Sequence, residues 1–159
     1  MVEPGLRCLA DNLNPGDGRV SGGNVELHRR AVEAYNAYDL EAFIAIADPS
    51  IEFHSVVAEI GGVYQGHDGL RRWRGDLEDA WGGEVRIEPE AFFDLGEHTL
   101  LFQVVHGRGK ESGAEVAMPV ANVMRWRDGR CVYSKVYTNR EDAFRDLGVP
   151  EDALEPIAP

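Results

Sequence analysis

The residues best suited to chemistry lie on segments that read as β-strands, and one of these carries a histidine. Residues 50–57 alternate in polarity and include β-branched side chains, which is typical of a strand. Phe53 and His54 are neighbours there, and only one can point inward because successive strand side chains face opposite ways. An inward His54 would suit acid–base catalysis, since the unperturbed pKa of histidine is about 6.5. The alternative is an exposed or backbone-bonded His54.

A second candidate is Asn122, an amide on an otherwise apolar strand face. It shares that face with Val116, Met118, Val120 and Met124. A polar group in such surroundings needs a hydrogen-bond partner or a ligand. We therefore expect Asn122 either to contact a bound molecule or to make a structural hydrogen bond, for example to Tyr35 or Tyr137.

Apolar and aromatic side chains could line a pocket around these polar groups. The candidates for ligand contact are Tyr35, Phe53, Trp73, Phe102, Met118, Val120 and Tyr137. Aromatic and methionine stripes at regular spacing usually fill a protein interior, so core packing is the alternative for most of them. The two tyrosine hydroxyls could point into the same space or into bulk water.

No pattern of a metal or cofactor site is present in the sequence. Cys8 and Cys131 are the only cysteines, and no histidine pair at metal-ligand spacing coincides with carboxylates. The glycines at 61, 62 and 66 are not followed by the Gly-Lys-Ser/Thr of a phosphate-binding loop. We therefore expect neither a metal ion nor a cofactor.

Charge and hydropathy exclude several classes of partner. Sixteen Lys and Arg against 28 Asp and Glu give a net charge of −12, which disfavours binding to nucleic acid or to anionic lipid. The longest apolar runs fall far short of the ~20 residues of a membrane span. The N-terminal residues do not form a secretory signal, so a reducing cytoplasm is the expected location.

Helical periodicity dominates the first half of the chain. A first helix is expected from Asn24, as its N-cap, because apolar residues recur at helical spacing from Val25 to Tyr35. A second follows the break at residues 38–39 and ends at Asp48-Pro49. A third carries an apolar stripe from Leu70 to Trp81, after a short extended piece at residues 63–65.

The second half reads as an antiparallel sheet. Strands are expected over residues 85–94, 98–108, 114–127 and 130–137, the last two joined by an Asp128-Gly129 hairpin turn. Thr138 begins a capping-box pattern that predicts a last helix over residues 142–147. Helices followed by a meander indicate an α+β fold.

Domain organisation follows from length and composition. At 159 residues the chain supports one domain. Residues 1–23, rich in Gly, Pro and Asn, are expected to be a flexible extension, residues 24–148 the domain, and residues 149–159 a tail. The run 100–105 is apolar at five of six positions, which suggests burial of both sheet faces. A homodimer through the sheet would explain this, as would a sheet curved around its own core.

Three segments carry a family resemblance. They are Tyr-Asn-Ala-Tyr-Asp-Leu-Glu at 35–41, Tyr-Gln-Gly-His-Asp-Gly-Leu at 64–70, and Trp-Arg-Asp-Gly-Arg at 126–130. In order and spacing they resemble the SnoaL-like branch of the nuclear transport factor 2-like superfamily, which includes ketosteroid isomerase. The resemblance implies a cone-shaped α+β barrel, with three helices on a curved sheet around an apolar cavity. It also implies one small hydrophobic ligand and a homodimer through the outer face of the sheet.

The resemblance suggests where catalytic groups would lie, and this chain departs from the pattern there. Ketosteroid isomerases use a carboxylate base, a tyrosine and a protonated aspartic acid. The corresponding positions here are Phe53, Ala31 and Asn122. A shift of one residue would put His54 at the base position, with Asn122 and a tyrosine donating hydrogen bonds to an oxyanion.

Two functions stay open at this point. The first is an enzyme of the isomerase, cyclase or lyase type that uses His54 and Asn122 for keto–enol chemistry on a small hydrophobic molecule. The second is a non-catalytic binding or dimeric assembly module whose cavity is filled by side chains. A continuous pocket of ~300 Å³ or more containing both residues would favour the enzyme. A cavity closed by Trp73, Phe53 and Met118 would favour the module.

Overall fold

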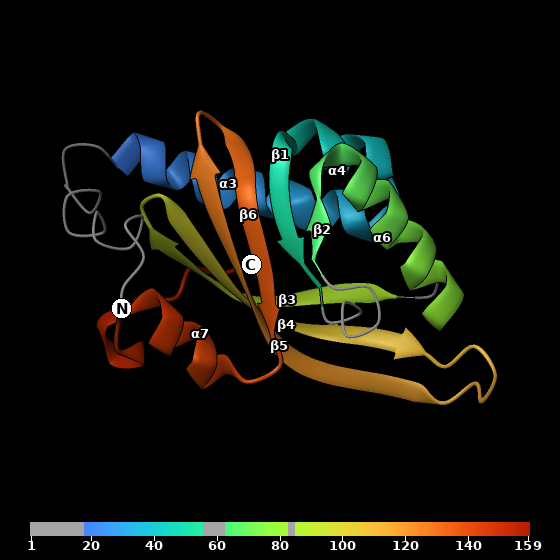
Figure 1. Ribbon diagram of the computed structural model, residues 1–159. Coiled ribbons are helices and arrows are strands. Elements are labelled where there is room, and N and C mark those ends of the chain that lie inside the picture. Colours follow the sequence, from blue (N-terminus) through green and yellow to red (C-terminus); the bar gives the residue numbers. More distant parts are fainter. Residues whose placement is uncertain (1–17, 56–62, 83–84) are drawn as a thin grey trace.

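A six-stranded mixed sheet carries helices on both of its faces (Figure 1). The computed structural model describes residues 18–55, 63–82 and 85–159. The elements are α3 (Gly18–Asn36), α4 (Leu40–Ile46), β1 (Ala47–His54), β2 (Tyr64–Gln65), α6 (Gly66–Trp81), β3 (Arg86–Leu95), β4 (His98–Arg108), β5 (Glu115–Arg127), β6 (Arg130–Tyr137), α7 (Arg140–Leu147) and a 3-10 turn (Glu151–Ala153). The predicted α+β class and element order are confirmed.

Strands follow the order β2-β1-β6-β5-β4-β3, so the sheet is open, with β2 and β3 at its edges. β1 runs parallel to β6, and the other neighbours are antiparallel. Figure 1 shows the long strands β4 and β5 bending sharply across the molecule. The β5–β6 turn has positive φ at Asp128 (52°) and Gly129 (76°), as a two-residue type I′ hairpin requires.

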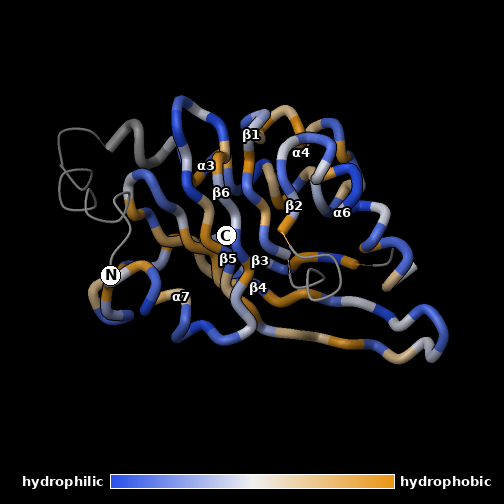
Figure 2. The backbone as a smooth tube through the Cα atoms, in the orientation of Figure 1, coloured by the Kyte–Doolittle hydropathy of each residue, from blue (hydrophilic) through white to orange (hydrophobic). Residues whose placement is uncertain are grey.

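The two faces of the sheet are covered by different helices. α3, α4 and α6 cover the inner face, where a core cluster includes Ala31, Phe43 and Leu70. α7 covers part of the outer face through Phe144, which packs with Leu100 and Phe93. Figure 2 shows hydrophobic residues concentrated along the strands, while the connecting turns are hydrophilic.

Burial of both faces along β4 is explained within a single chain. Leu100 belongs to the outer cluster with α7, whereas Leu101 packs on the inner side against Val25 and Val32 of α3. Residues 100–102 of the apolar run therefore need no second copy of the chain to cover them. The sequence predicts this C-terminal helix but not the face of the sheet that it covers, because a short helix pattern carries no information on tertiary position.

The first helix begins earlier than expected, and Asn24 is not its N-cap. α3 starts at Gly18, so Asn24 lies inside the helix. Its buried side chain instead donates through Nδ2 to the Gly96 carbonyl, 3.0 Å away. A tertiary hydrogen bond between α3 and the β3–β4 turn therefore explains an asparagine that looks like a cap in the sequence. The predicted flexible extension at 1–23 falls mostly on residues 1–17, which lie outside the described residues.

The predicted C-terminal tail returns to the edge of the sheet. Ile157 pairs with Phe92 of β3 through two backbone hydrogen bonds of 2.9 and 2.7 Å. The Ala158 carbonyl accepts from Arg29 of α3 at 2.8 Å. The tail thus shields part of the exposed edge of β3, a location where unpaired backbone groups would otherwise face solvent.

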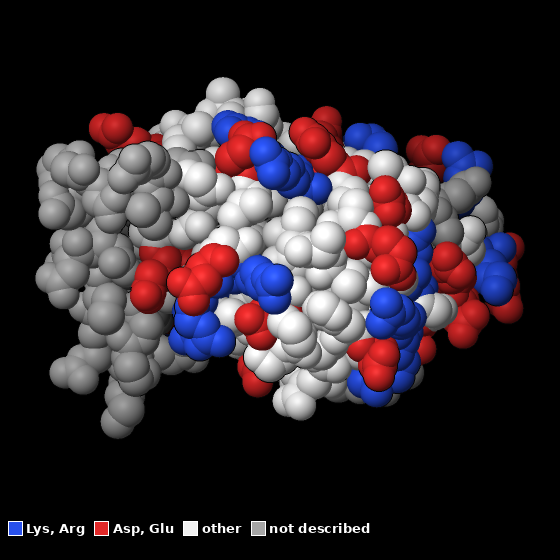
Figure 3. Space-filling model, turned by 90° about the horizontal axis from the view of Figure 1, so that it is seen from above, with Lys and Arg blue, Asp and Glu red and all other residues white. Residues whose placement is uncertain are grey.

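Among the described residues, none of the helices has the length and apolar character needed to cross a membrane. Figure 3 shows acidic and basic side chains interspersed over one face of the molecule. The cytoplasmic location stays a prediction from the sequence.

The N-cap of α7 lies one residue later than the capping-box pattern predicts. Asn139, not Thr138, accepts from the Glu141 amide, at 2.9 Å. We expect Asn139→Ala to lower the free energy of unfolding by about 1 kcal/mol, because it removes this acceptor. Thr138→Ala, at an exposed residue, should change it by less than about 0.5 kcal/mol. Urea unfolding followed by circular dichroism measures both, and a larger effect at Thr138 would contradict the assignment.

Candidate functional site

A narrow cavity of about 80 Å³ lies between the inner face of the sheet and helices α3, α4 and α6. Its β5 side is formed by Val116, Met118, Asn122 and Met124, so the cavity runs lengthwise along that strand. The volume is well below the roughly 300–1,000 Å³ typical of small-molecule sites. The cavity therefore suits an occupant of about one ring rather than a polycyclic molecule.

Aromatic rings from helices α3 and α6 and from strand β1 line the cavity. Trp73 of α6 lies between Phe53 of β1 and Tyr35 of α3, with ring centroids 4.7 and 5.8 Å away. Trp81, at the end of α6, lies over Gly107 of β4, where a Cβ would come within 3.1 Å of its ring. A side chain at position 107 would push Trp81 off the strand.

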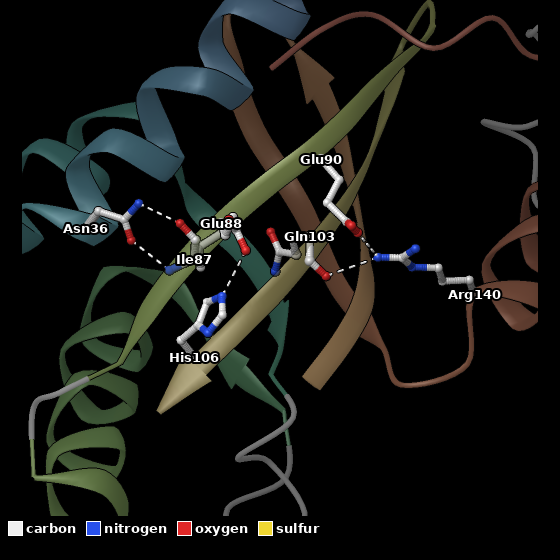
Figure 4. Close-up of polar contacts among 7 residues, drawn as sticks. All are labelled: Asn36, Ile87, Glu88, Glu90, Gln103, His106 and Arg140. Carbon is white, nitrogen blue, oxygen red and sulfur yellow. Dashed lines mark hydrogen bonds and ion pairs between the residues drawn. The ribbon is translucent and has the colours of Figure 1, made fainter. Parts of the chain in front are cut away.

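The cavity shares Gly107 and Val116 with a wider open depression of about 590 Å³. That depression is lined mainly by charged and exposed residues, His106 and Arg86 among them. His106 pairs there with Glu88 at 2.9 Å (Figure 4). We take the smaller cavity as the candidate site because its lining is mainly apolar, whereas the depression beside it is lined by charged residues.

Few polar groups reach the cavity, and one of them lacks a partner. Gln103 of β4 lines the cavity and is 3% exposed, yet its Oε1 has no hydrogen-bond partner among the described residues. Figure 4 shows that its backbone oxygen, in contrast, accepts from Arg140 at 3.3 Å. An unpaired buried amide costs on the order of 1–3 kcal/mol, so this side chain indicates a missing partner.

Asn122 lines the cavity, and its amide is fully engaged. Oδ1 lies 2.9 Å from His28 Nε2. Nδ2 donates both protons, to Ser134 Oγ at 3.0 Å and to the Lys135 carbonyl at 3.2 Å. Asn122 therefore has no free donor for an oxyanion, and its predicted tyrosine partners are replaced by His28 and Ser134.

His28 is the functional candidate that sequence reasoning missed. It is fully buried on α3, and its Nδ1 lies 2.7 Å from Thr99 Oγ1. Thr99 Oγ1 accepts from the Trp126 indole at 2.8 Å. Burial lowers the pKa of His28 to about 4, against a smaller opposing effect of its bond to Asn122. The available signal was a histidine on the apolar stripe of the first helix, which needs a partner just as Asn122 does.

His54 does not reach the cavity, which corrects its predicted role as the base. Phe53 points inward, so the next residue on β1 faces outward. There His54 Nε2 lies 2.8 Å from Glu52 Oε2, and its ring lies 5.3 Å from that of Tyr133. His54 is therefore a partly exposed histidine outside the cavity that pairs with a side-chain carboxylate.

The other predicted ligand contacts divide between the two faces of the sheet. Tyr35, Phe53, Trp73, Met118 and Asn122 line the cavity. Phe102 and Tyr137 lie on the outer face, where Phe102 packs on Phe144 of α7 and Tyr137 bonds to Asp146 at 2.8 Å. Val120 is fully buried but does not line the cavity. Where both faces of a strand are buried, the sequence pattern does not show which side chains point inward. This explains why the sequence predicts Phe102 and Tyr137 in the cavity.

Ionisable groups are scarce in the cavity. Among its described lining residues, Tyr35 alone is titratable, and burial raises the pKa of its hydroxyl well above 10. Across the described part of the chain, no group of three or more His, Cys, Asp or Glu is placed to hold a metal ion. The lining therefore offers hydrogen bonds and apolar contacts, but not a base with a pKa near neutrality.

A profile of the SnoaL-like domain family matches residues 28–134, about two thirds of the chain. No curated protein matches. Among solved structures, an NTF2-like protein of unknown function from Burkholderia pseudomallei is 21% identical, with a TM-score of 0.67, over 79% of this chain and 97% of its own. TerC, co-crystallised with polyporic acid, is 17% identical, with a TM-score of 0.67, over 79% and 98%.

A third similar structure is a protein from Catenulispora acidiphila with a ketosteroid isomerase-like fold, in complex with trimethylamine. It is 18% identical, with a TM-score of 0.64, over 80% of this chain and 95% of its own. At these identities the similarity establishes the shared fold.

The buried neutral His28 makes stability depend on pH. Its pKa is about 6.5 in the unfolded chain and about 4 when folded, so the unfolded state takes up a proton first as the pH falls. Stability is therefore full above pH 6.5 and is lost between pH 6.5 and 4, by about 3 kcal/mol for this residue. His98, whose pKa burial also lowers to about 4, adds in the same direction.

We expect His28→Gln to reduce this loss, as measured by urea unfolding at pH 7.5 and 4.5. His54→Gln, at a partly exposed histidine, is the matched control and should follow the wild-type pH dependence. Equal pH dependence in His28→Gln and the wild type would contradict a neutral buried His28.

Proposed function

The chain belongs to the SnoaL-like domain family, and we propose that it binds one small, mainly apolar molecule in the cavity between α3, α6 and the sheet. The observation that carries the proposal is the Gln103 amide oxygen, which has no partner among the described residues, in a mainly apolar lining. A fold that buries such a group without a partner loses stability. A ligand that donates a hydrogen bond to this oxygen would recover that loss.

The shape and chemistry of the lining support a ring-shaped occupant. Phe53, Trp73 and Tyr35 present ring surfaces on one side, and Met118 and Met124 present flexible thioethers on the other. Aromatic walls with a few placed polar groups are typical of small-molecule sites. The proposal of a bound small molecule is also supported by TerC, a protein of similar fold that was co-crystallised with polyporic acid.

Binding is a better account of this lining than proton transfer. Keto–enol catalysis needs a base within hydrogen-bond reach of the reacting carbon. The described lining residues include no Asp, Glu, Lys, Arg or His, and His54 is on the other face. The cavity is also smaller than the ~300 Å³ set for the enzyme hypothesis, and it contains Asn122 without His54.

The test is capture of the ligand. Purified protein is incubated with an extract of its native host, repurified, and analysed by native mass spectrometry. We expect one added small-molecule mass per chain. Gln103→Leu should retain less of it, while its free energy of unfolding without ligand rises by about 1 kcal/mol, since an unpaired amide is removed.

The other glutamine, Gln65, is exposed, and its side chain makes no capping hydrogen bond. Gln65→Leu is therefore the matched control, and it should bind like the wild type. Absence of any captured mass would overturn the proposed function. Full retention of the ligand by Gln103→Leu would show that Gln103 does not bind it.

We also propose that the protein is a homodimer through the part of the outer sheet face that α7 leaves uncovered. Val104 is half-buried there, and Ala117 and Pro119 are exposed on β5 beside it.

Light scattering after size-exclusion chromatography should give twice the chain mass of 17.6 kDa. Val104→Arg should yield monomers, while Val63→Arg, at an exposed valine elsewhere, should not. A monomeric wild type would overturn this proposal.

A further inference from the structure

A chain of buried hydrogen bonds lies behind the cavity. The chemistry of its side chains determines which atom donates and which accepts in each bond. The Lys135 carbonyl can only accept, so the Asn122 atom that faces it, 3.2 Å away, is the amide nitrogen. The oxygen of Asn122 therefore faces His28 Nε2 at 2.9 Å. That contact requires a proton on Nε2, since the amide oxygen has none to give.

The direction continues on the other side of His28. The ring is neutral at ordinary pH because burial lowers its pKa to about 4, so Nδ1 carries no proton and accepts from the Thr99 hydroxyl at 2.7 Å. Thr99 in turn accepts from Trp126, whose indole N–H is only a donor. Each proton in the chain thus points from Trp126 toward Asn122.

The last member of this chain is Ser134, a residue of the cavity lining. Its Oγ accepts from Asn122 Nδ2 at 3.0 Å, so its own proton is free to be donated elsewhere. No described residue accepts that proton, and Ser134 is 1% exposed. A buried hydroxyl proton beside a cavity, without an acceptor, indicates a hydrogen bond made to something inside the cavity.

We propose that Ser134 donates a hydrogen bond to a neutral acceptor oxygen of the bound molecule, such as a ketone carbonyl, and that His28 is a positioning residue that acts through Asn122. This inference rests on the proposed binding function and names the chemical class of its ligand. A carboxylate is a poor fit, because no cationic side chain among the described lining residues would offset the cost of burying its charge.

The test uses two probes of matched shape, acetophenone and α-methylstyrene, which differ by a carbonyl oxygen in place of a CH₂ group. Isothermal titration calorimetry gives both Kd values. We expect the wild type to bind acetophenone about ten-fold more tightly than α-methylstyrene, the usual effect of one hydrogen bond. Ser134→Ala should bind the two probes equally, with its affinity for α-methylstyrene unchanged.

A second serine supplies the matched control. Ser55 also lines the cavity, but its Oγ accepts from the Trp73 indole at 3.1 Å, and it has further interactions. Ser55→Ala should therefore keep the ten-fold preference for the ketone. Binding of α-methylstyrene shows in each variant that the cavity has folded.

The role of His28 is tested by two substitutions. His28→Gln can still donate to Asn122 and accept from Thr99, so the preference for acetophenone should persist. His28→Leu removes both bonds, so it should lose most of the preference while still binding α-methylstyrene. Loss of the preference in both variants would show that the histidine does not act through this chain of hydrogen bonds.

The possible failures are distinguishable. Equal binding of both probes by the wild type, or a preference that survives Ser134→Ala, would overturn the role of Ser134 and leave the binding function standing. Binding of neither probe, with a ligand still captured from the host extract, would overturn the proposed ligand class. Absence of any captured ligand would overturn the binding function itself.

Discussion

The hydrogen bond between His28 and Asn122 is the constraint on which the arrangement of the site depends. It joins the first helix to the middle of the sheet, across 94 residues of chain, at a place without solvent. Burial keeps the imidazole neutral, and the amide must turn its oxygen toward Nε2, because an unpaired group here would cost on the order of 1–3 kcal/mol. That orientation engages both Asn122 protons and leaves the proton of the Ser134 hydroxyl, on the cavity lining, as the next donor in the chain.

Successive side chains on a strand point to opposite faces of the sheet, which separates the contacts with the cavity from those with α7. Gln103 faces the cavity, whereas its neighbour Phe102 packs on the outer face against α7. Arg140 of α7 bonds to the backbone oxygens of Gln103 and Val120 (3.3 Å each) from that side. The last helix is therefore connected through the backbone to the residue that we propose contacts the ligand, although it never reaches the cavity.

Most of the fold follows from local patterns in the sequence. The helices and long strands appear where periodicity, Gly and Pro predict them, and Asp128-Gly129 forms the expected turn. The sequence assigns Asn24 and Thr138 as N-caps from residue type alone. Asn24 is instead a tertiary hydrogen-bond partner, and Thr138 precedes the residue that is the N-cap. Sequence patterns near helix ends cannot separate these roles.

By itself, the sequence determined the fold class, the order of the elements, and the polar identity of Asn122 on an apolar strand. Periodicity and turn chemistry are local, so they can be read along the chain. The tertiary structure alone decided that Phe53 rather than His54 faces inward, and that His28 is the partner of Asn122. Those outcomes depend on the register of strands and on contacts between residues far apart, where a shift of one position exchanges the two faces of a strand.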